Sequence, residues 1–166
     1  MIFTYLKLFF TDRERFNSHM RYLKLQRTMR RKLRKLANTF LPWSGHYMHE
    51  MVKTMIDFYL ETYQAGDCCW RDEKYLKDIA DTLAQVKHYL DNLDKTDELD
   101  VTELITTAKT FPDFKTFCKE FAAEMNTTPS KLSEAMKGVA AYEFLEKKYT
   151  SMVYKLIGEH IWEWCD

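Results

Sequence analysis

Apolar residues recur every three or four positions along most of this chain, the spacing of one face of an α-helix. From Tyr22 onward the apolar stripe consists of Leu25, Met29, Leu33, Leu36 and Phe40. Basic residues keep the same period on a different face. Thr11 and Glu14 have the S/T-x-x-E spacing of a capping box, and Leu41-Pro42 should stop the helix. The pattern predicts an amphipathic basic helix over about residues 12–38.

Two longer helices are expected next. One opens at Ser44 or Gly45, stops at Gly66, and buries a stripe of Met48, Met51, Val52, Met55, Phe58, Tyr59 and Tyr63. The other buries Trp70, Leu76, Ile79, Ala80, Leu83, Leu90 and Leu93. This helix ends within the acidic stretch DNLDKTDELD, which is interpreted as a solvated connection.

The last part of the chain has further helix signals. Asp100 and Glu103 form a capping pattern before a short helix that Phe111-Pro112 closes, and Asp113 begins another. That helix should carry on one face Phe114, Phe117, Cys118, Phe121 and Met125. Helical pattern resumes at Ser130 and runs to Trp164, with a break expected near Gly138.

These elements predict an all-α, single-domain helical bundle of about five or six helices over residues 1–166. Four glycines and three prolines are too few for many tight turns, and a chain of 166 residues buries roughly 70% of its unfolded surface on folding. The first ten residues fit a helix or a strand, and we favour the helix.

Composition favours a cytoplasmic protein without a membrane anchor. The apolar opening MIFTYLKLFF lacks the charge pattern and the cleavage site of a signal peptide, and no uncharged apolar run reaches the ~20 residues of a membrane span. The four cysteines lack zinc-type spacing, so we interpret them as reduced thiols with structural roles.

Charge is distributed very unevenly along the chain. Residues 13–35 hold ten basic side chains against one acid, a balance of +9, and residues 36–166 carry −9. Seven of the eight arginines lie in that basic segment, and the arginine fork suits phosphate or carboxylate. The predicted anion-binding residues are Lys24, Arg27, Arg30, Arg31, Arg34 and Lys35. The same charges would also fit a solvated face, or neutralisation of the acidic remainder of this chain or of a second copy in a homodimer.

The segment AAEMNTTPSKLSEAMKG, residues 122–138, resembles the helix-turn-helix of phage repressor and Cro-type regulators. Ala122 matches the small residue at the helix crossing, Asn126 the left-handed turn position, and Leu132 and Met136 the buried positions of a second helix opened by Pro129-Ser130. The resemblance implies that Lys131, Ser133 and Lys137 face DNA. An ordinary capped junction between two helices fits the same residues.

Taken whole, the chain also resembles short, uncharacterised proteins of large bacteriophages. The resemblance rests on HYMHEMVKTMIDFYLETYQ, on WRDEKYLKDIADTLAQVKHYLDNL and on the closing FLEKKYTSMVYKLIGEHIWEWCD. It implies an all-helical protein in the host cytosol, where small phage proteins often counter host defence.

No sequence signature of an enzyme is present. The chain has no glycine-rich phosphate loop, nucleophile elbow or HExxH motif, so we expect no enzymatic activity and no cofactor. The favoured hypothesis is a phage-type binding protein whose basic helix holds a nucleotide or nucleic acid. The alternatives are a helix-turn-helix transcription regulator, a module that binds an acidic host protein or a sister subunit, and, weakest, a helical metal enzyme. His46, His49 and Glu50 lie within one helical turn, where two imidazoles could share a metal, but we favour a helix start with exposed histidines.

Overall fold

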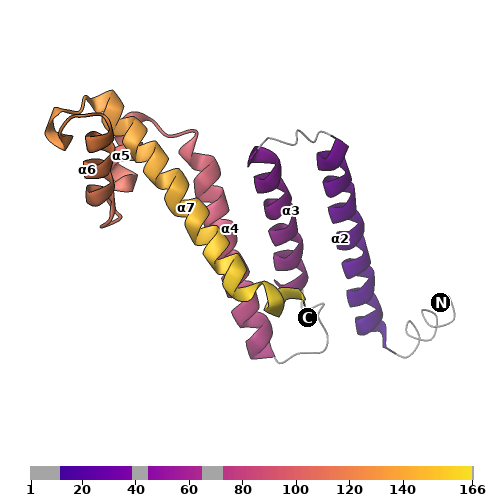
Figure 1. The fold of residues 1–166 in the computed structure, drawn as a ribbon. Helices are drawn as coiled ribbons and strands as arrows, with labels where there is room; N and C mark the ends of the chain where they lie inside the picture. The colour runs from indigo at the N-terminus through magenta and orange to yellow at the C-terminus, as the bar shows by residue number, and fades with distance from the viewer. Residues whose placement is uncertain (1–11, 39–44, 65–72, 166) are drawn as a thin grey trace. The chain divides into compact units, whose positions relative to one another are not determined.

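The structure is a computed structural model, and it describes residues 12–38, 45–64 and 73–165 (Figure 1). Its α-helices are α2 (Arg13–Asn38), α3 (Gly45–Gln64), α4 (Glu73–Thr96), α5 (Val101–Ala108), α6 (Phe114–Glu124) and α7 (Glu134–Cys165), with a 3-10 turn, η1 (Pro129–Lys131), before α7. These residues contain no strand, which confirms the predicted all-α fold.

The chain divides into two compact units. One comprises residues 1–87 and 160–166, and the other comprises residues 88–159. Helices α4 and α7 each contribute residues to both units. The single-domain organisation therefore stays a prediction.

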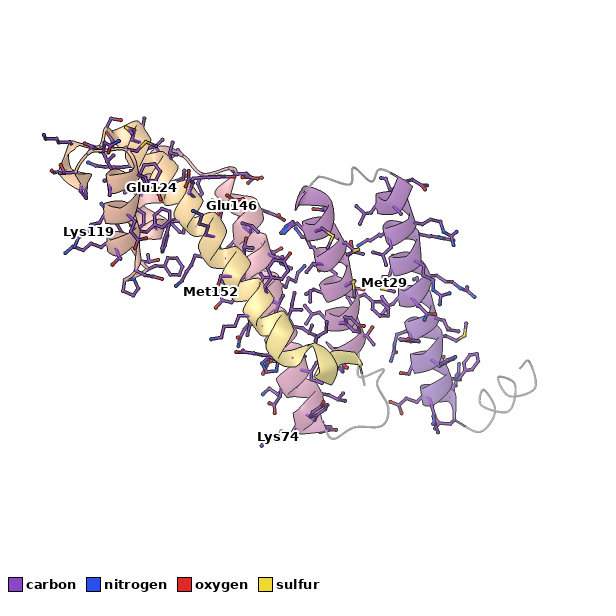
Figure 2. All side chains as sticks on the ribbon, in the orientation of Figure 1. Met29, Lys74, Lys119, Glu124, Glu146 and Met152 are labelled. Carbon is purple, nitrogen blue, oxygen red and sulfur yellow. The ribbon has the colours of Figure 1, made fainter. Side chains whose placement is uncertain are left out.

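In the first unit, α2 packs against α3 through a half-buried apolar stripe. The rings of Tyr22 and Phe58 lie 6.1 Å apart, and Met29 points from α2 toward α3 (Figure 2). The predicted stripe is confirmed from Leu25 to Leu36, although each of its members is only half-buried. Ser18 is the one buried residue in the described part of α2. Phe40 lies outside the described residues.

A carboxylate caps the start of α2. The backbone N–H of Arg15 donates to Asp12 Oδ1 at 2.9 Å, and the N–H of Phe16 donates to the Asp12 carbonyl. Asp12 is therefore the N-cap residue, one position after the predicted Thr11, which lies outside the described residues. A short side-chain carboxylate also suits the positive end of the helix dipole.

The predicted stripe of α3 is confirmed only in part: Tyr63 is buried as predicted, and Met51, Val52, Phe58 and Tyr59 are half-buried. Ile56, Leu60 and Tyr63 are buried, whereas Met48 and Met55 are exposed. Ile56 follows Met55 by one position, and one residue turns an α-helix by about 100°. The prediction of Met48 and Met55 as core residues was therefore wrong. The apolar stripe of α3 is wider than the surface that packs against the rest of the protein, so the residues at one edge of the stripe stay exposed to solvent.

Helix α4 ends inside the acidic stretch DNLDKTDELD, as predicted. It runs through most of the acidic stretch to Thr96, which is buried and donates its hydroxyl to the Asn92 carbonyl. Leu90 and Thr96 continue the buried line of Ile79 and Leu83, so the stretch keeps one buried side despite its acids. The interpretation of the whole stretch as a solvated connection was wrong for this reason.

In the second unit, the end of α4 runs antiparallel to α7. Tyr89 stacks on Tyr149 at 6.4 Å, and the Tyr142 hydroxyl donates to Asp97 Oδ1 at 2.7 Å, so residue numbers rise on one helix as they fall on the other. Around α7 lies an aromatic core. Its buried members are Leu104, Ala108, Phe114, Ala141, Phe144, Leu145 and Tyr149.

Local signals position α5 and α6 on this core. Asp100 and Glu103 form the predicted capping box, with each carboxylate accepting a hydrogen bond from the other residue's backbone N–H. Asp113 precedes α6 as predicted, and its carboxylate pairs with Lys148 of α7. Met125 was expected within this helix, but it follows the last turn of α6 as the C-cap residue and is exposed.

Gly138 lies inside α7, and the helix continues through it without the expected break. A Cβ at this position would lie 2.9 Å from Val101 Cγ1, at the first residue of α5. The glycine therefore permits a close approach of α5 to α7 and does not end the helix.

Candidate functional site

The six predicted anion-binding side chains all lie on α2 and are all exposed. Lys24, Arg27, Arg31, Arg34 and Lys35 follow the three- and four-residue steps of one helix face, opposite the stripe that packs toward α3. Arg30 lies at the edge of that face. From Lys24 to Arg34 the row extends about 15 Å along the helix axis, at 1.5 Å per residue.

Most of these cations have no acidic partner among the residues that the structure describes. Lys24, Arg27, Arg30, Arg31 and Arg34 make no ion pair in the part of the chain that the structure describes. Lys35 takes part in a further contact and is not counted with them. We call these five unpaired side chains the arginine row.

A hollow of about 730 Å³ lies along the same helix. Lys24, Arg27 and Arg31 border it, together with the polar side chains of Asn17 and Thr28. Arg30, Arg34 and Lys35 are not among its lining residues. The structure thus places three of the six predicted residues along one open hollow of α2.

The segment that resembles a helix-turn-helix has a left-handed turn where the resemblance places one. Asn126 has φ of 52°, a backbone conformation that asparagine tolerates better than most residues. Ala122 and Leu132 are buried at 0% and 4% exposure, at the positions expected to be apolar contacts. After the 3-10 turn η1, Leu132 is extended and α7 begins only at Glu134.

The three residues expected to face DNA lie in different settings. Lys131 ends η1 and is exposed. Ser133 precedes α7, and its hydroxyl accepts a hydrogen bond from the Met136 N–H at 3.3 Å, which makes it a helix cap. Lys137 is half-buried and borders a hollow within the second unit.

That second hollow was not predicted from the sequence. Its volume is about 530 Å³, and its apolar walls come from Ile105, Phe111, Phe114, Cys118 and Leu132. Four lysines also line it: Lys109, Lys115, Lys119 and Lys137. The sequence signal was the alternation of lysine and phenylalanine in residues 109–119, but only the fold shows that α5, α6 and α7 bring these residues together.

Burial raises the pKa of the Cys118 thiol at this hollow, against the opposing effect of the Lys137 charge. The thiol therefore stays protonated at neutral pH and behaves as part of the apolar wall. Elsewhere in the second unit, the hydrogen bond to Asp97, with some burial, raises the pKa of Tyr142 to about 12.

In the described ranges, no three or more His, Cys, Asp or Glu side chains gather as a metal site would require. His49 is half-buried in α3 and takes part in another contact. No helix among the described residues is both long enough and apolar enough to cross a membrane.

No protein-family model matches this chain significantly, and neither does any curated protein or solved structure.

Proposed function

We propose that this chain is a non-enzymatic binding protein whose helix α2 holds a phosphate-bearing ligand, either a nucleotide or a nucleic acid backbone. The observation that carries the proposal is the arginine row: five exposed cations that no carboxylate of the described chain neutralises. An arginine fork donates two parallel hydrogen bonds to a phosphate, so the arginines of the row are suited to this ligand.

The arrangement supports binding of several phosphates more than one isolated ion. Lys24, Arg27 and Arg31 succeed one another at about 4.5 and 6 Å along the helix axis and border the same hollow. Asn17 and Thr28 add polar groups at its wall, although the Thr28 hydroxyl already donates to the Lys24 carbonyl. A flexible phosphodiester chain could lie along such a row.

The test is a thermal-shift and fluorescence-anisotropy panel of nucleotides, cyclic oligonucleotides, single-stranded DNA and duplex DNA at low and moderate salt. The triple variant Arg27→Gln, Arg31→Gln, Arg34→Gln should lose at least about tenfold in affinity for the ligand that binds best. On single-stranded DNA, the slope of log K against log salt concentration should flatten by about 2, because each of the three lost phosphate contacts contributes roughly 0.7 to that slope.

A matched control removes the same charge elsewhere. Lys77, Lys147 and Lys155 are exposed lysines outside α2, so Lys77→Gln, Lys147→Gln, Lys155→Gln should bind like the unmodified protein. Changing the three arginines to lysine keeps the charge and removes the fork, and should give an intermediate affinity. If no ligand shifts the melting temperature at low salt, the proposal fails.

The second candidate is a sequence-specific DNA-binding regulator using residues 113–138. The left-handed Asn126 and the buried Ala122 and Leu132 favour it. It predicts that Lys131→Ala and Lys137→Ala abolish discrimination between operator and random duplex while the arginine row supplies backbone affinity. The first proposal predicts that these two variants leave nucleotide binding unchanged.

The unpaired cations would also suit an acidic partner, either a host protein or the acidic part of a second copy. That alternative predicts no retention on nucleic acid even at low salt, and a homodimer whose dissociation constant rises with salt. The resemblance to phage proteins suggests the setting: a protein in the host cytosol that sequesters a nucleotide signal or occupies a host nucleic-acid-binding factor as counter-defence.

A further inference from the structure

The lysine-lined hollow of the second unit is built from three elements that the core holds in place. Phe114 of α6 and Leu132 before α7 are 6% and 4% exposed, so two of its walls belong to packed clusters. The capping box of α5 fixes the helix that contributes Ile105. The hollow is therefore pre-formed, and its volume of about 530 Å³ lies in the range of roughly 300–1,000 Å³ typical of small-molecule sites.

The lining of this hollow combines apolar walls, which we call the apolar floor, with four lysines at its edge. The walls are aliphatic, aromatic and thiol groups, and no acidic residue lies among the described residues that line it. The four lysines come from α6, from α7 and from the residue after α5. Lys119 extends from α6 on the side away from α7 (Figure 2).

None of these lysines is neutralised within the described chain. Lys109, Lys115, Lys119 and Lys137 form no ion pair there, whereas the nearby Lys148 pairs with Asp113. An apolar floor favours a hydrocarbon group, and unpaired ammonium groups favour an anion at its end. A cationic ligand would be repelled, and a fully polar anion would leave the apolar floor unfilled.

We propose that this hollow is a binding site for a small anionic amphiphile, a hydrocarbon chain that ends in a carboxylate or phosphate. The tail lies against Phe111, Phe114 and Leu132, and the head pairs with lysines at the edge. This site is distinct from the arginine row, and the two proposals do not depend on each other.

The test is calorimetric titration of the full chain with dodecanoate and dodecyl phosphate below their micelle concentrations, and with dodecanol and dodecyltrimethylammonium as neutral and cationic forms of the same tail. We expect both anions to bind at one site per chain, and dodecanol at least about tenfold more weakly. The tighter of the two anions identifies the head group. If dodecanol binds as well as the anions, or no anion binds, the proposal is overturned.

Two double variants separate the site from general surface charge. Lys115→Met with Lys119→Met keeps the apolar stems and removes two charges at the hollow, and should weaken dodecanoate binding by about tenfold. Lys131→Met with Lys155→Met removes two exposed charges outside the lining and should leave binding unchanged. Equal losses in both variants would contradict the proposal.

Cys118 provides a readout that requires no substitution. Bound dodecanoate should slow alkylation of this thiol by N-ethylmaleimide at least about fivefold, measured on its own peptide by mass spectrometry, because the ligand covers the wall that the thiol forms. Binding without protection of Cys118 would place the ligand elsewhere and overturn the proposal. The triple variant of Arg27, Arg31 and Arg34 should retain dodecanoate binding, so failure of one proposal is distinguishable from failure of the other.

Discussion

Helix α2 and helix α7 are both long and amphipathic in sequence, yet they use their side chains in opposite ways. The 26 residues of α2 include one buried side chain, Ser18, in the described part. In α7 the buried residues Ala140, Ala141, Phe144, Leu145, Tyr149 and Val153 form a continuous line. Tertiary packing supplies most helix stability in proteins, so α7 contributes to the stability of the fold and α2 mainly presents charge.

The largest expected change in the free energy of unfolding comes from replacing one leucine in each of these two helices. Leu145 of α7 is fully buried, so Leu145→Ala should lower the free energy of unfolding by about 3–5 kcal/mol through lost burial and a cavity. Leu33 of α2 is half-buried, and Leu33→Ala should cost about 1 kcal/mol. Urea denaturation followed by circular dichroism measures both. Equal costs would show that α2 is packed as firmly as α7.

Two glycines of α7 allow a comparison of closely packed and open positions within one helix. Among the described residues, a Cβ added at Gly158 would meet no atom from outside its own stretch of helix within 4 Å, so Gly158→Ala should raise stability by roughly 0.5–1 kcal/mol through helix propensity. At Gly138 the same Cβ would lie 2.9 Å from Val101 Cγ1, so Gly138→Ala should gain less or destabilise. The melting temperatures of the two variants test this, and an equal gain at Gly138 would mean that α5 does not press on α7.

The next largest effect is a dependence of stability on pH that arises from Tyr142 in the second unit. The hydrogen bond to Asp97 raises the pKa of Tyr142 from its ordinary 10 to about 12, so the neutral phenol is favoured in the folded state. This hydrogen bond therefore stabilises the folded state fully below pH 10, and the stabilisation is lost as the pH rises to about 12. Tyr142→Phe should cost less than about 1 kcal/mol at pH 8 and should flatten this alkaline loss. An identical pH profile in the variant would contradict this assignment.

The smallest change in the free energy of unfolding is expected when arginines of α2 are replaced. Since Arg27 and Arg31 form no ion pair in the described chain, Arg27→Ala with Arg31→Ala should change the free energy of unfolding by less than about 0.5 kcal/mol. The same denaturation experiment tests it, now as a control for ligand binding. A loss above about 1 kcal/mol would assign these arginines a structural role and weaken the anion-binding proposal.

Periodicity and capping signals predicted much of the fold. The capping box at Asp100 and the exposed basic face opposite Leu25 and Met29 both follow from local rules, because caps and helix faces depend on neighbours within one turn. The exposure of Met48 and Met55 did not follow, since a wide apolar stripe does not reveal which of its edges meets a partner helix.

The two candidate sites also differ in how far the sequence alone predicts them. The arginine row was predictable because it lies on one helix and its charges stand out in composition. The lysine-lined hollow was not, because Ile105, Cys118 and Lys137 come from three helices and only packing brings them together. Local sequence predicts surfaces on a single element better than cavities between several.

The unneutralised arginine row has a consequence for the behaviour of the protein in solution. With zero formal net charge and a sequence pI of about 7.0, the molecule at neutral pH has no overall repulsion to keep copies apart, while its segment of +9 can attract the acidic remainder of another copy. Added salt screens that attraction within a Debye length of about 8–10 Å. The protein should therefore dissolve better at about 0.15 M salt than in a dilute buffer near neutral pH, the reverse of salting out.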